Sequence, residues 1–466
     1  MTPPKRQLGI AIAAAIVIAN MIGSGVFVSA GYQAAFNFKD PLTMMSTWVV
    51  GGIIALCGAA TYAELGSLMP RAGGEYVYLR EAYHPAVGFM SGWVSLVVGF
   101  SAPIAAAALL FAYYLGALVP GFGDPIATKA VACTLIVAMT ALHAFDTRLG
   151  GRVQTGFTIA KVVLIVVFIG AGLLVGHGDW SHFASRGDGL SQLGTRAGAA
   201  NYATALMFVS FAYSGWNAAA YVAGEIDHPQ RTLPKALLLG TVVVMALYIL
   251  LNLVFIYAVP PETMGADPDK MPVGDLAARA LFGNAAGDLL SSLIALALMS
   301  AVSAMMMAGP RVYATMAADH ALPHPLSYYS KRGVPVVAVI VQCALAIGFA
   351  IFSNPEALVR LVGFTLAAFA ALTVGSVFIF RARGKLSAYR TPGYPVTPIL
   401  FIALSVWTVY FGASAEPKLA LEILGVLVVG AAIYMVTSRG KARTPIEDDE
   451  LAAPLPTAQV VDDKPA

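Results

Sequence analysis

Two short segments of the chain combine glycine and serine between large apolar residues. Residues 21–27 read Met-Ile-Gly-Ser-Gly-Val-Phe, and residues 211–217 read Phe-Ala-Tyr-Ser-Gly-Trp-Asn. Glycine costs a helix about 1 kcal/mol relative to alanine, and serine offers the backbone competing hydrogen bonds. Both segments are therefore candidate helix breaks. A break frees N–H groups, which suit a carboxylate, and carbonyls, which suit an ammonium or sodium. A site that offers both suits a zwitterion, which points to an amino acid.

Lys161 is the one cation that lies well inside an apolar segment. It follows Arg152 by nine residues, which corresponds to about 13 Å along a helix. A charge within a bilayer is costly, so such a residue is a functional candidate, although its stem could also carry the ammonium toward the membrane surface. Ser303 lies eight residues before Arg311 in another apolar segment, at a similar depth. We therefore predict that Ser303 accepts a hydrogen bond from Lys161.

The composition indicates which elements position these residues. Of 466 residues, 58% are hydrophobic and 11% are charged, whereas soluble domains have about 45–50% and about 25%. The apolar residues fall in blocks of about 18 or more, long enough to cross a bilayer. The net charge of +3 is too small to indicate a nucleic-acid partner. These values exclude a soluble enzyme, a disordered chain and a disulfide-stapled secreted domain, and they predict an all-α polytopic membrane protein.

The cysteines and histidines give no sign of a metal or a cofactor. Cys57, Cys133 and Cys343 all lie within apolar segments, without a Cys-x-x-Cys spacing. The seven histidines lie at the ends of apolar segments or in loops, so no facing pair is available to bind haem. We expect neither a metal site nor a cofactor.

Twelve apolar segments predict twelve membrane spans. They cover residues 8–34, 42–66, 85–117, 126–145, 153–176, 199–223, 234–259, 286–309, 335–353, 356–380, 394–412 and 418–437. Lys and Arg are more frequent in the loops that lie on the same side of the membrane as the N-terminus, as at Arg71 and Arg381. By the positive-inside rule, this distribution places both termini in the cytoplasm. The predicted location is the cell (inner) membrane. Residues 440–466, rich in Pro, Asp and Ala, are predicted to form a disordered cytosolic tail.

The two candidate breaks fall in spans one and six, and the first ten spans divide into five and five. Paired interruptions at corresponding positions are typical of an inverted-repeat transporter with a binding site near the middle of the membrane. Either motif alone would also fit close helix packing, because small residues are common at such interfaces. The expected units are a first repeat over 1–176, a second over 199–380 and two further spans over 394–437.

In their order along the chain, several motifs resemble those of the amino acid–polyamine–organocation superfamily, in particular its L-type amino acid transporter branch and bacterial relatives. The motifs are residues 22–27, 62–66, 70–79, 211–217, 225–234 and 311–323. The resemblance implies a leucine-transporter-like fold with a 5+5 inverted repeat and two additional C-terminal helices. It also implies a secondary active transporter of amino acids that works by alternating access and is not an enzyme.

The resemblance further implies roles for particular residues. The implied substrate-binding residues are Met21, Gly23, Ser24, Gly25, Phe211, Ala212, Ser214 and Asn217. Of these, Gly23, Ser24 and Gly25 would hold the substrate carboxylate. Carbonyls for its ammonium would come from Met21, Phe211, Ala212 and Ser214. Phe211 would also be the gate, and Asn217 would lie beside the substrate. Lys161 would stand where sodium-coupled relatives bind sodium, which argues against sodium coupling.

The other acidic residues favour a neutral substrate. Glu64, Glu225 and Asp319 lie at predicted cytosolic ends of spans, where arginines such as Arg71 and Arg311 are available as partners. No unpaired carboxylate is expected at the depth of the substrate, which favours neutral L-amino acids over cationic amino acids or polyamines. All three cysteines lie within spans, so no disulfide-linked partner chain is implied.

Three questions about function stay open. Exchange and proton symport both fit the resemblance. A proton-translocating subunit of an energy-converting enzyme is an alternative of another class, but it would need several charges within successive spans. A channel would prefer a filter of charged side chains or carbonyls, usually built by oligomerisation.

Overall fold

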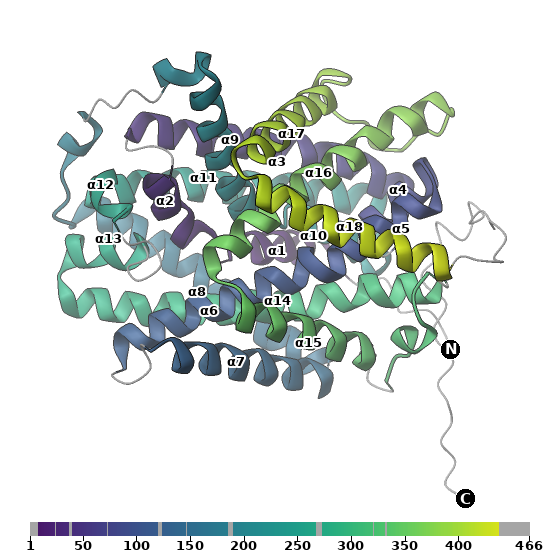
Figure 1. The fold of residues 1–466 in the computed structure, drawn as a ribbon, viewed down its shortest axis with the longest axis horizontal. Helices are drawn as coiled ribbons and strands as arrows, with labels where there is room; N and C mark the ends of the chain where they lie inside the picture. Colours follow the sequence, from purple (N-terminus) through teal and green to yellow (C-terminus); the bar gives the residue numbers. More distant parts are fainter. Residues whose placement is uncertain are drawn as a thin grey trace, which may run out of the picture.

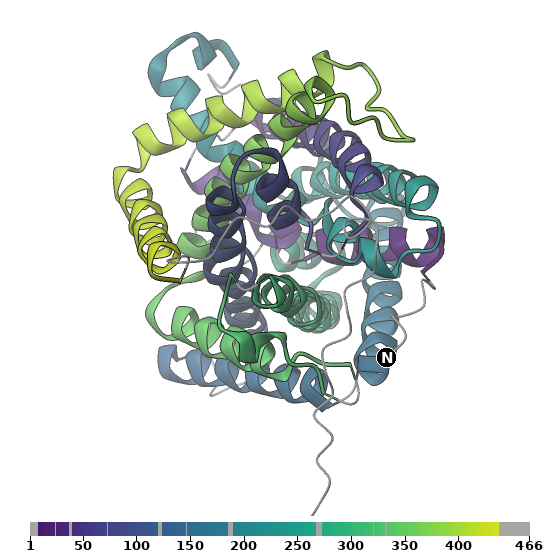
Figure 2. The same ribbon diagram turned by 90° about the vertical axis from the view of Figure 1, so that its right-hand side faces the viewer.

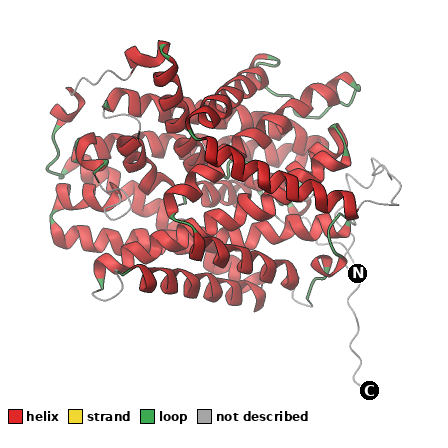
Figure 3. Cartoon of the chain, viewed as in Figure 1, coloured by secondary structure: helices red, strands yellow, loops and turns green. Residues whose placement is uncertain are grey.

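Helices make up nearly all the regular structure of the computed structural model (Figure 3). The structure describes residues 8–23, 25–36, 40–71, 73–119, 124–145, 147–184, 190–266, 273–319, 321–330 and 333–437. Within these ranges there is no strand, only one isolated bridge between Leu8 and Ile226. Ser24 and the predicted tail over 440–466 lie outside the described residues.

The helices follow the predicted spans closely. In the first half they are α1 (Ile10–Met21), α2 (Gly25–Phe36), α3 (Pro41–Leu68), α4 (Glu75–Ala82), α5 (Pro85–Val94), the π-helical η1 (Ser95–Phe100), α6 (Ser101–Leu118), α7 (Pro125–Phe145) and α8 (Thr147–Leu174). The short 3-10 turns η2 (Trp180–Ala184) and η3 (Leu190–Gly194) connect them to the second half.

The second half begins with another broken span. Its helices are α9 (Arg196–Tyr213), α10 (Ala218–Tyr221), η4 (Ala223–Glu225), α11 (Pro229–Ala258), α12 (Pro261–Met264), α13 (Val273–Phe282), α14 (Asn284–Ala318), η5 (His324–Ser327), α15 (Val336–Phe352) and α16 (Pro355–Ala382). Two further helices, α17 (Val396–Ala415) and α18 (Pro417–Thr437), complete the described chain.

The membrane-spanning character of the fold is confirmed. Over the described ranges, ten helical segments are long and apolar enough to cross a membrane, and α15 is a shorter apolar helix. The remaining predicted span is the broken pair of α9 and α10. Helix α14 continues to Ala318, nine residues past the predicted end of its span at 309. The apolar run stops near Arg311, but a helix can continue into the polar region because its hydrogen bonds lie within the segment.

Local sequence explains where several helices begin. Proline occupies the first position of α3, α5, α11 and α16, where its missing N–H costs nothing. The Asp40 side chain accepts a hydrogen bond from the Thr43 amide at 2.8 Å and so caps α3. The Asn354 side chain caps α16 in the same way.

The broken spans lie in the interior of the helix bundle. Helix α1 packs against α11 and α14, and α2 packs against α9. Helices α7 and α15 lie side by side at the lower edge of Figure 1. The last helix, α18, lies at the outer rim, as the turned view shows (Figure 2). Residues from both halves of the chain therefore surround the two breaks.

Candidate substrate site

The break between α1 and α2 lies directly against the break between α9 and α10. Gly215 has a φ of +100°, and a Cβ atom there would lie 2.8 Å from the backbone carbonyl carbon of Asn20. A Cβ atom on Gly25 would lie 2.5 Å from the Cα atom of Ala212. Since a side chain at either position would collide with the other break, the two glycines permit this contact. The structure thus confirms both helix breaks and brings them together.

Lys161 caps the end of α1. Its side chain is fully enclosed, with 1% of the residue exposed, and Nζ donates hydrogen bonds of 2.6 Å to the carbonyls of Ala19 and Ile22. A cation is favourable there because the last carbonyls of a helix carry partial negative charge. The predicted hydrogen bond to Ser303 is not formed. The Ser303 hydroxyl lies 2.8 Å from Nε2 of His143 instead, so the acceptors of Lys161 belong to the backbone of span one.

Tyr248 of α11 joins the two breaks. Its hydroxyl lies within hydrogen-bonding distance of the carbonyls of Met21, at 2.5 Å, and Ala212, at 3.1 Å. The carbonyl of Phe211 accepts from both the amide and the hydroxyl of Ser214, at 3.0 and 2.6 Å. A carbonyl oxygen has two lone pairs, so the two donors of Ser214 occupy both of those on Phe211, and a substrate ammonium would have to displace one of them.

A cavity lies beside the break in span six. It holds about 90 Å³ of water-accessible space between α3, η1, α14, α16 and α17. Ser214 and Asn217, both predicted substrate-binding residues, line it. Phe211 does not line it and is 4% exposed. The described lining contains several aromatic rings, among them Phe100 and Trp216. Met21, Gly23, Gly25 and Ala212 lie in or next to the breaks rather than on the cavity wall.

The π-helical segment η1 was not predicted from the sequence. Ser95, Gly99 and Phe100 of this segment line the cavity, and the Ser101 hydroxyl donates to the carbonyl of Leu96 at 2.7 Å. Such segments interrupt α-helices and often occur at functional sites. Span three does carry a breaker signal here that the sequence analysis did not use: Pro103 has no N–H to donate to the carbonyl of Gly99, four residues earlier.

Glu75 is the cavity residue that the sequence analysis missed. It begins α4, lies on the cavity wall and is 3% exposed. Its Oε1 accepts hydrogen bonds from the Tyr62 hydroxyl at 2.7 Å and from Nδ2 of Asn217 at 2.9 Å. Burial raises the pKa of the Glu75 carboxyl above its ordinary value. Among the described residues of the lining, Glu75 is the one Asp, Glu, Lys, Arg or His. A carboxylate with neutral partners thus lines the cavity, whereas the sequence analysis expected no unpaired carboxylate at the depth of the substrate.

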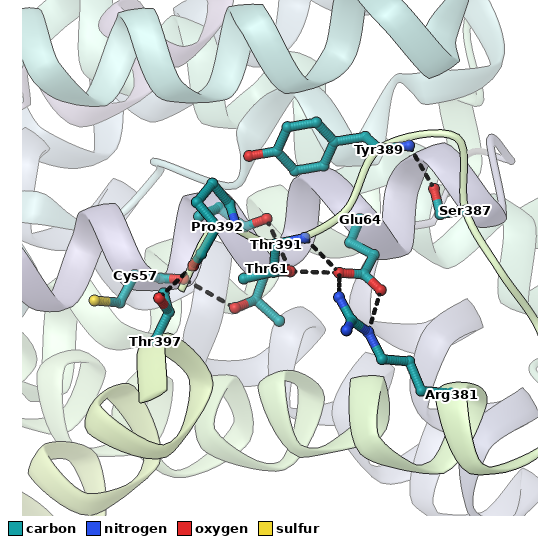
Figure 4. Close-up of polar contacts among 10 residues, drawn as sticks. Cys57, Thr61, Glu64, Arg381, Ser387, Tyr389, Thr391, Pro392 and Thr397 are labelled. Atoms are coloured by element: carbon teal, nitrogen blue, oxygen red, sulfur yellow. Dashed lines mark hydrogen bonds and ion pairs between the residues drawn. The ribbon is translucent and has the colours of Figure 1, made fainter. Parts of the chain in front are cut away.

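Glu64 shows the opposite arrangement for a buried carboxylate (Figure 4). Arg381 of α16 donates to both of its oxygens, from Nε and Nη2, at 2.8 Å each. The amide and the hydroxyl of Thr391 donate to Oε2 at 2.7 and 2.6 Å. The charge of Glu64 is thus matched by an arginine in the bidentate geometry that binds carboxylates best.

Asp319 and Glu225 also have cationic partners, although not always the predicted ones. Asp319 at the end of α14 pairs with Arg71 at 2.5 Å and with Arg80 at 2.7 Å. Glu225 pairs with Arg311 at 3.2 Å. These pairs connect the ends of helices that are far apart in the sequence. Glu75 therefore differs from Glu64, Asp319 and Glu225 in having neutral partners.

Comparison with known proteins agrees with this architecture. Residues 8–436 match the family model described as amino acid permease. The chain is 32% identical to the serine/threonine exchanger SteT of Bacillus subtilis over 86% of this chain and 89% of the relative. It is 30% identical to the human b(0,+)-type amino acid transporter 1, over 89% and 84% of the two chains. It is 26% identical to the human large neutral amino acids transporter small subunit 2, over 93% and 80%.

Proposed function

Since the chain belongs to the amino acid permease family, within the amino acid–polyamine–organocation superfamily, and is therefore an amino acid transporter, we propose that it carries neutral L-amino acids by sodium-independent exchange. The observation that carries this proposal is the contact between the two helix breaks beside a cavity that is almost free of charged side chains. Two relatives support it by their names, one a serine/threonine exchanger and one a large neutral amino acids transporter. Proton symport is the alternative mode of transport.

In this proposal the backbone holds the two charges of the substrate. The N–H groups at the start of α2, from Gly23 to Gly25, bind the carboxylate at the positive end of a helix dipole. The carbonyls of Met21, Phe211, Ala212 and Ser214 bind the ammonium. Asn217 faces the substrate from the cavity wall, and Phe211 is the proposed gate because it precedes the break that would close over the substrate.

Sodium independence is proposed from the position of Lys161. Its ammonium already serves the carbonyls of Ala19 and Ile22 at the end of α1. A sodium ion bound there would lie beside a positive charge, which is unfavourable. Lys161 would then act either as a fixed charge that holds span one or as a group that binds and releases a proton during transport.

The topology is proposed from the charge distribution. Both termini lie in the cytoplasm, and the repeats extend over 1–176 and 199–380. The bacterial exchanger among the relatives supports a location in the cell membrane.

The substrate is tested by a thermal-shift screen of the purified protein against the twenty amino acids. Each amino acid that stabilises the protein is then tested by radiolabelled counterflow in liposomes, with and without a sodium gradient. Neutral amino acids should stabilise the protein, and uptake should accelerate when the vesicles are preloaded. If no α-amino acid stabilises the protein, the substrate proposal fails, and if uptake requires sodium, sodium independence fails.

A second candidate is transport of cationic amino acids, and Glu75 is the specific observation that favours it. A carboxylate on the cavity wall could pair with the side chain of lysine or arginine. The same screen separates the two, because stabilisation by lysine and arginine but not by serine or leucine would favour the cationic substrate.

A further inference from the structure

Glu75 is a buried acid that has no matching cation among the residues that the structure describes. Both recorded donors to its Oε1, the Tyr62 hydroxyl and the Asn217 amide, are neutral groups. A carboxylate taken out of water costs several kcal/mol unless a cation or several hydrogen bonds compensate for it. Two neutral hydrogen bonds compensate for only part of this cost, so water in the cavity and a bound proton are the remaining sources of stabilisation.

The titratable groups that face Glu75 are tyrosines. They are Tyr62 from α3, Tyr78 from its own helix α4 and Tyr221 from α10. Tyr313 of α14 lies behind Tyr221. Tyrosine hydroxyls are neutral at physiological pH, so they cannot supply the missing positive charge. The nearby arginines pair elsewhere, Arg381 with Glu64 and Arg80 with Asp319.

Asn217 connects Glu75 to the break in span six. Its Nδ2 donates to Glu75 at 2.9 Å and to the Tyr221 hydroxyl at 3.0 Å, and it directly precedes α10. An amino acid bound at the break would therefore lie close to the Glu75 carboxyl. It would displace water from the cavity but bring no net charge if its side chain is neutral.

We infer that Glu75 is a proton-binding group of the substrate cavity, which takes up one proton from water when a neutral amino acid fills the cavity. In this step an O–H bond of hydronium, or the bond that holds the proton on the protonated buffer, breaks and a new O–H bond forms on the carboxylate, so that the charge of Glu75 changes from −1 to 0 and water or deprotonated buffer is left in solution. The proton goes to Oε2, because Oε1 already accepts from two donors. The inference rests on the proposed function, because it concerns the same site and a neutral substrate.

Two consequences follow for transport. In an exchange cycle, each neutral amino acid carries one proton in its own direction, so that equal exchange moves no net proton. In one-way uptake the same chemistry makes the carrier a proton symporter. The affinity for a neutral amino acid should fall as the pH rises, whereas a cationic side chain would replace the proton and reverse this dependence.

Isothermal titration calorimetry of the full-length protein measures the proton directly. Serine, or another neutral amino acid that the thermal-shift screen finds, is titrated in two buffers of different ionisation enthalpy at the same pH. The difference in heat gives the number of protons taken up, and repetition from pH 5 to pH 9 gives the pH dependence of Kd. We expect wild type to take up as much as one proton, with Kd rising about tenfold for each unit by which the substrate shifts the pKa of Glu75.

Two variants connect the proton to Glu75. Glu75→Gln keeps the shape and an acceptor oxygen, so it should bind with no proton uptake and with a flat pH profile. Glu262→Gln removes an exposed carboxylate on α12 and should behave as wild type. If Glu75→Gln takes up the same number of protons as wild type, or if wild type binds without any uptake, the inference is overturned.

Tyr62→Phe gives an independent measurement if Glu75→Gln does not fold. It removes one donor to the ionised carboxylate while keeping the ring, whose centroid lies 4.7 Å from that of Trp216. The midpoint of the pH dependence should move to higher pH, and an unchanged midpoint contradicts the inference. If wild type binds no amino acid at all, the proposed function fails instead, which distinguishes the two failures.

Discussion

Replacing Lys161 with methionine tests whether its ammonium holds the broken first span together. Methionine keeps most of the apolar stem but removes both 2.6 Å hydrogen bonds to the carbonyls of Ala19 and Ile22. A buried carbonyl that loses its donor costs about 1–3 kcal/mol, so two cost about 2–6 kcal/mol. Removing a buried ammonium offsets part of this loss, because the burial of an ion is itself unfavourable. We expect the free energy of unfolding to fall by about 2–4 kcal/mol.

Unfolding of the purified protein in mixed micelles of dodecyl sulfate and dodecyl maltoside measures this change. Lys129→Met is the matched control, because Lys129 is exposed and its Nζ also donates to a backbone carbonyl, that of Ile351, at 2.6 Å. The control should change the free energy of unfolding by less than about 0.5 kcal/mol. Equal losses in the two variants would refute the proposed role of Lys161 at the end of α1. Retained amino acid binding with lost counterflow in Lys161→Met would assign Lys161 to the movement of span one rather than to binding.

Four further substitutions test the contacts around the breaks and the two buried acids. Tyr248→Phe removes the hydroxyl that joins the two breaks and should lower the free energy of unfolding by about 1–3 kcal/mol, measured in the same micelles. Gly215→Ala should lower the free energy of unfolding by about 2–4 kcal/mol, because Gly215 has a positive φ and lies in close contact with Asn20. Its control is Gly425→Ala, which should leave the free energy of unfolding unchanged because no atom lies within 4 Å of the added Cβ. Arg381→Met removes the cation from a buried carboxylate and should cost about 3 kcal/mol; a loss below about 0.5 kcal/mol, the size of an ordinary surface change, contradicts this. Burial raises the pKa of Glu75 above 4.5, so the folded state binds the proton more tightly and stability falls as the pH rises from 4.5 through the raised value. Glu75→Gln should therefore melt at a higher temperature than wild type at neutral pH, with a gap that closes as the pH falls toward 4.5, and a gap that does not vary with pH would contradict the linkage.

The sequence predicted the spans and the breaks because both depend on local properties. A bilayer requires a minimum length of apolar helix, so the positions of the spans follow from hydropathy, although the end of α14 at Ala318 does not. The breaks follow from the poor helix propensity of glycine and serine at Gly25 and Gly215, together with their equivalent places in spans one and six. The order of the motifs also identified the family, and the match of residues 8–436 to the amino acid permease model confirms it.

The partners of the charged residues could not be predicted in the same way. Lys161 was assigned to Ser303 from equal depth, but depth does not give the direction of a side chain around its helix axis. Its real acceptors are backbone carbonyls, Ala19 and Ile22, which become available only because α1 ends there. Glu64 pairs with Arg381, more than three hundred residues away, and no local pattern could have selected that partner.

Glu75 was missed because its sequence neighbours suggest a loop at the membrane surface. It follows Gly73 and Gly74, which both have positive φ, and a Cβ atom on Gly74 would lie 2.6 Å from the ring of Tyr221. The absence of a side chain at Gly74 therefore allows α4 to begin against α10, which brings Glu75 within reach of Asn217.

The same helix explains why no cation in the described part of the chain reaches Glu75. Arg80 is the nearest arginine that follows it in α4, but residues five apart lie about 140° from each other around a helix, whereas pairs three or four apart share a face. Arg80 consequently points away from the cavity and pairs with Asp319 at 2.7 Å. The isolation of Glu75 from positive charge thus results from the spacing of α4 and from the competing acid on α14. A cation at position 79 would share a face with Glu75, but that position holds Leu79, which is fully buried. No described residue thus places a counter-charge beside Glu75, which is why we infer that a proton supplies it when a neutral amino acid fills the cavity.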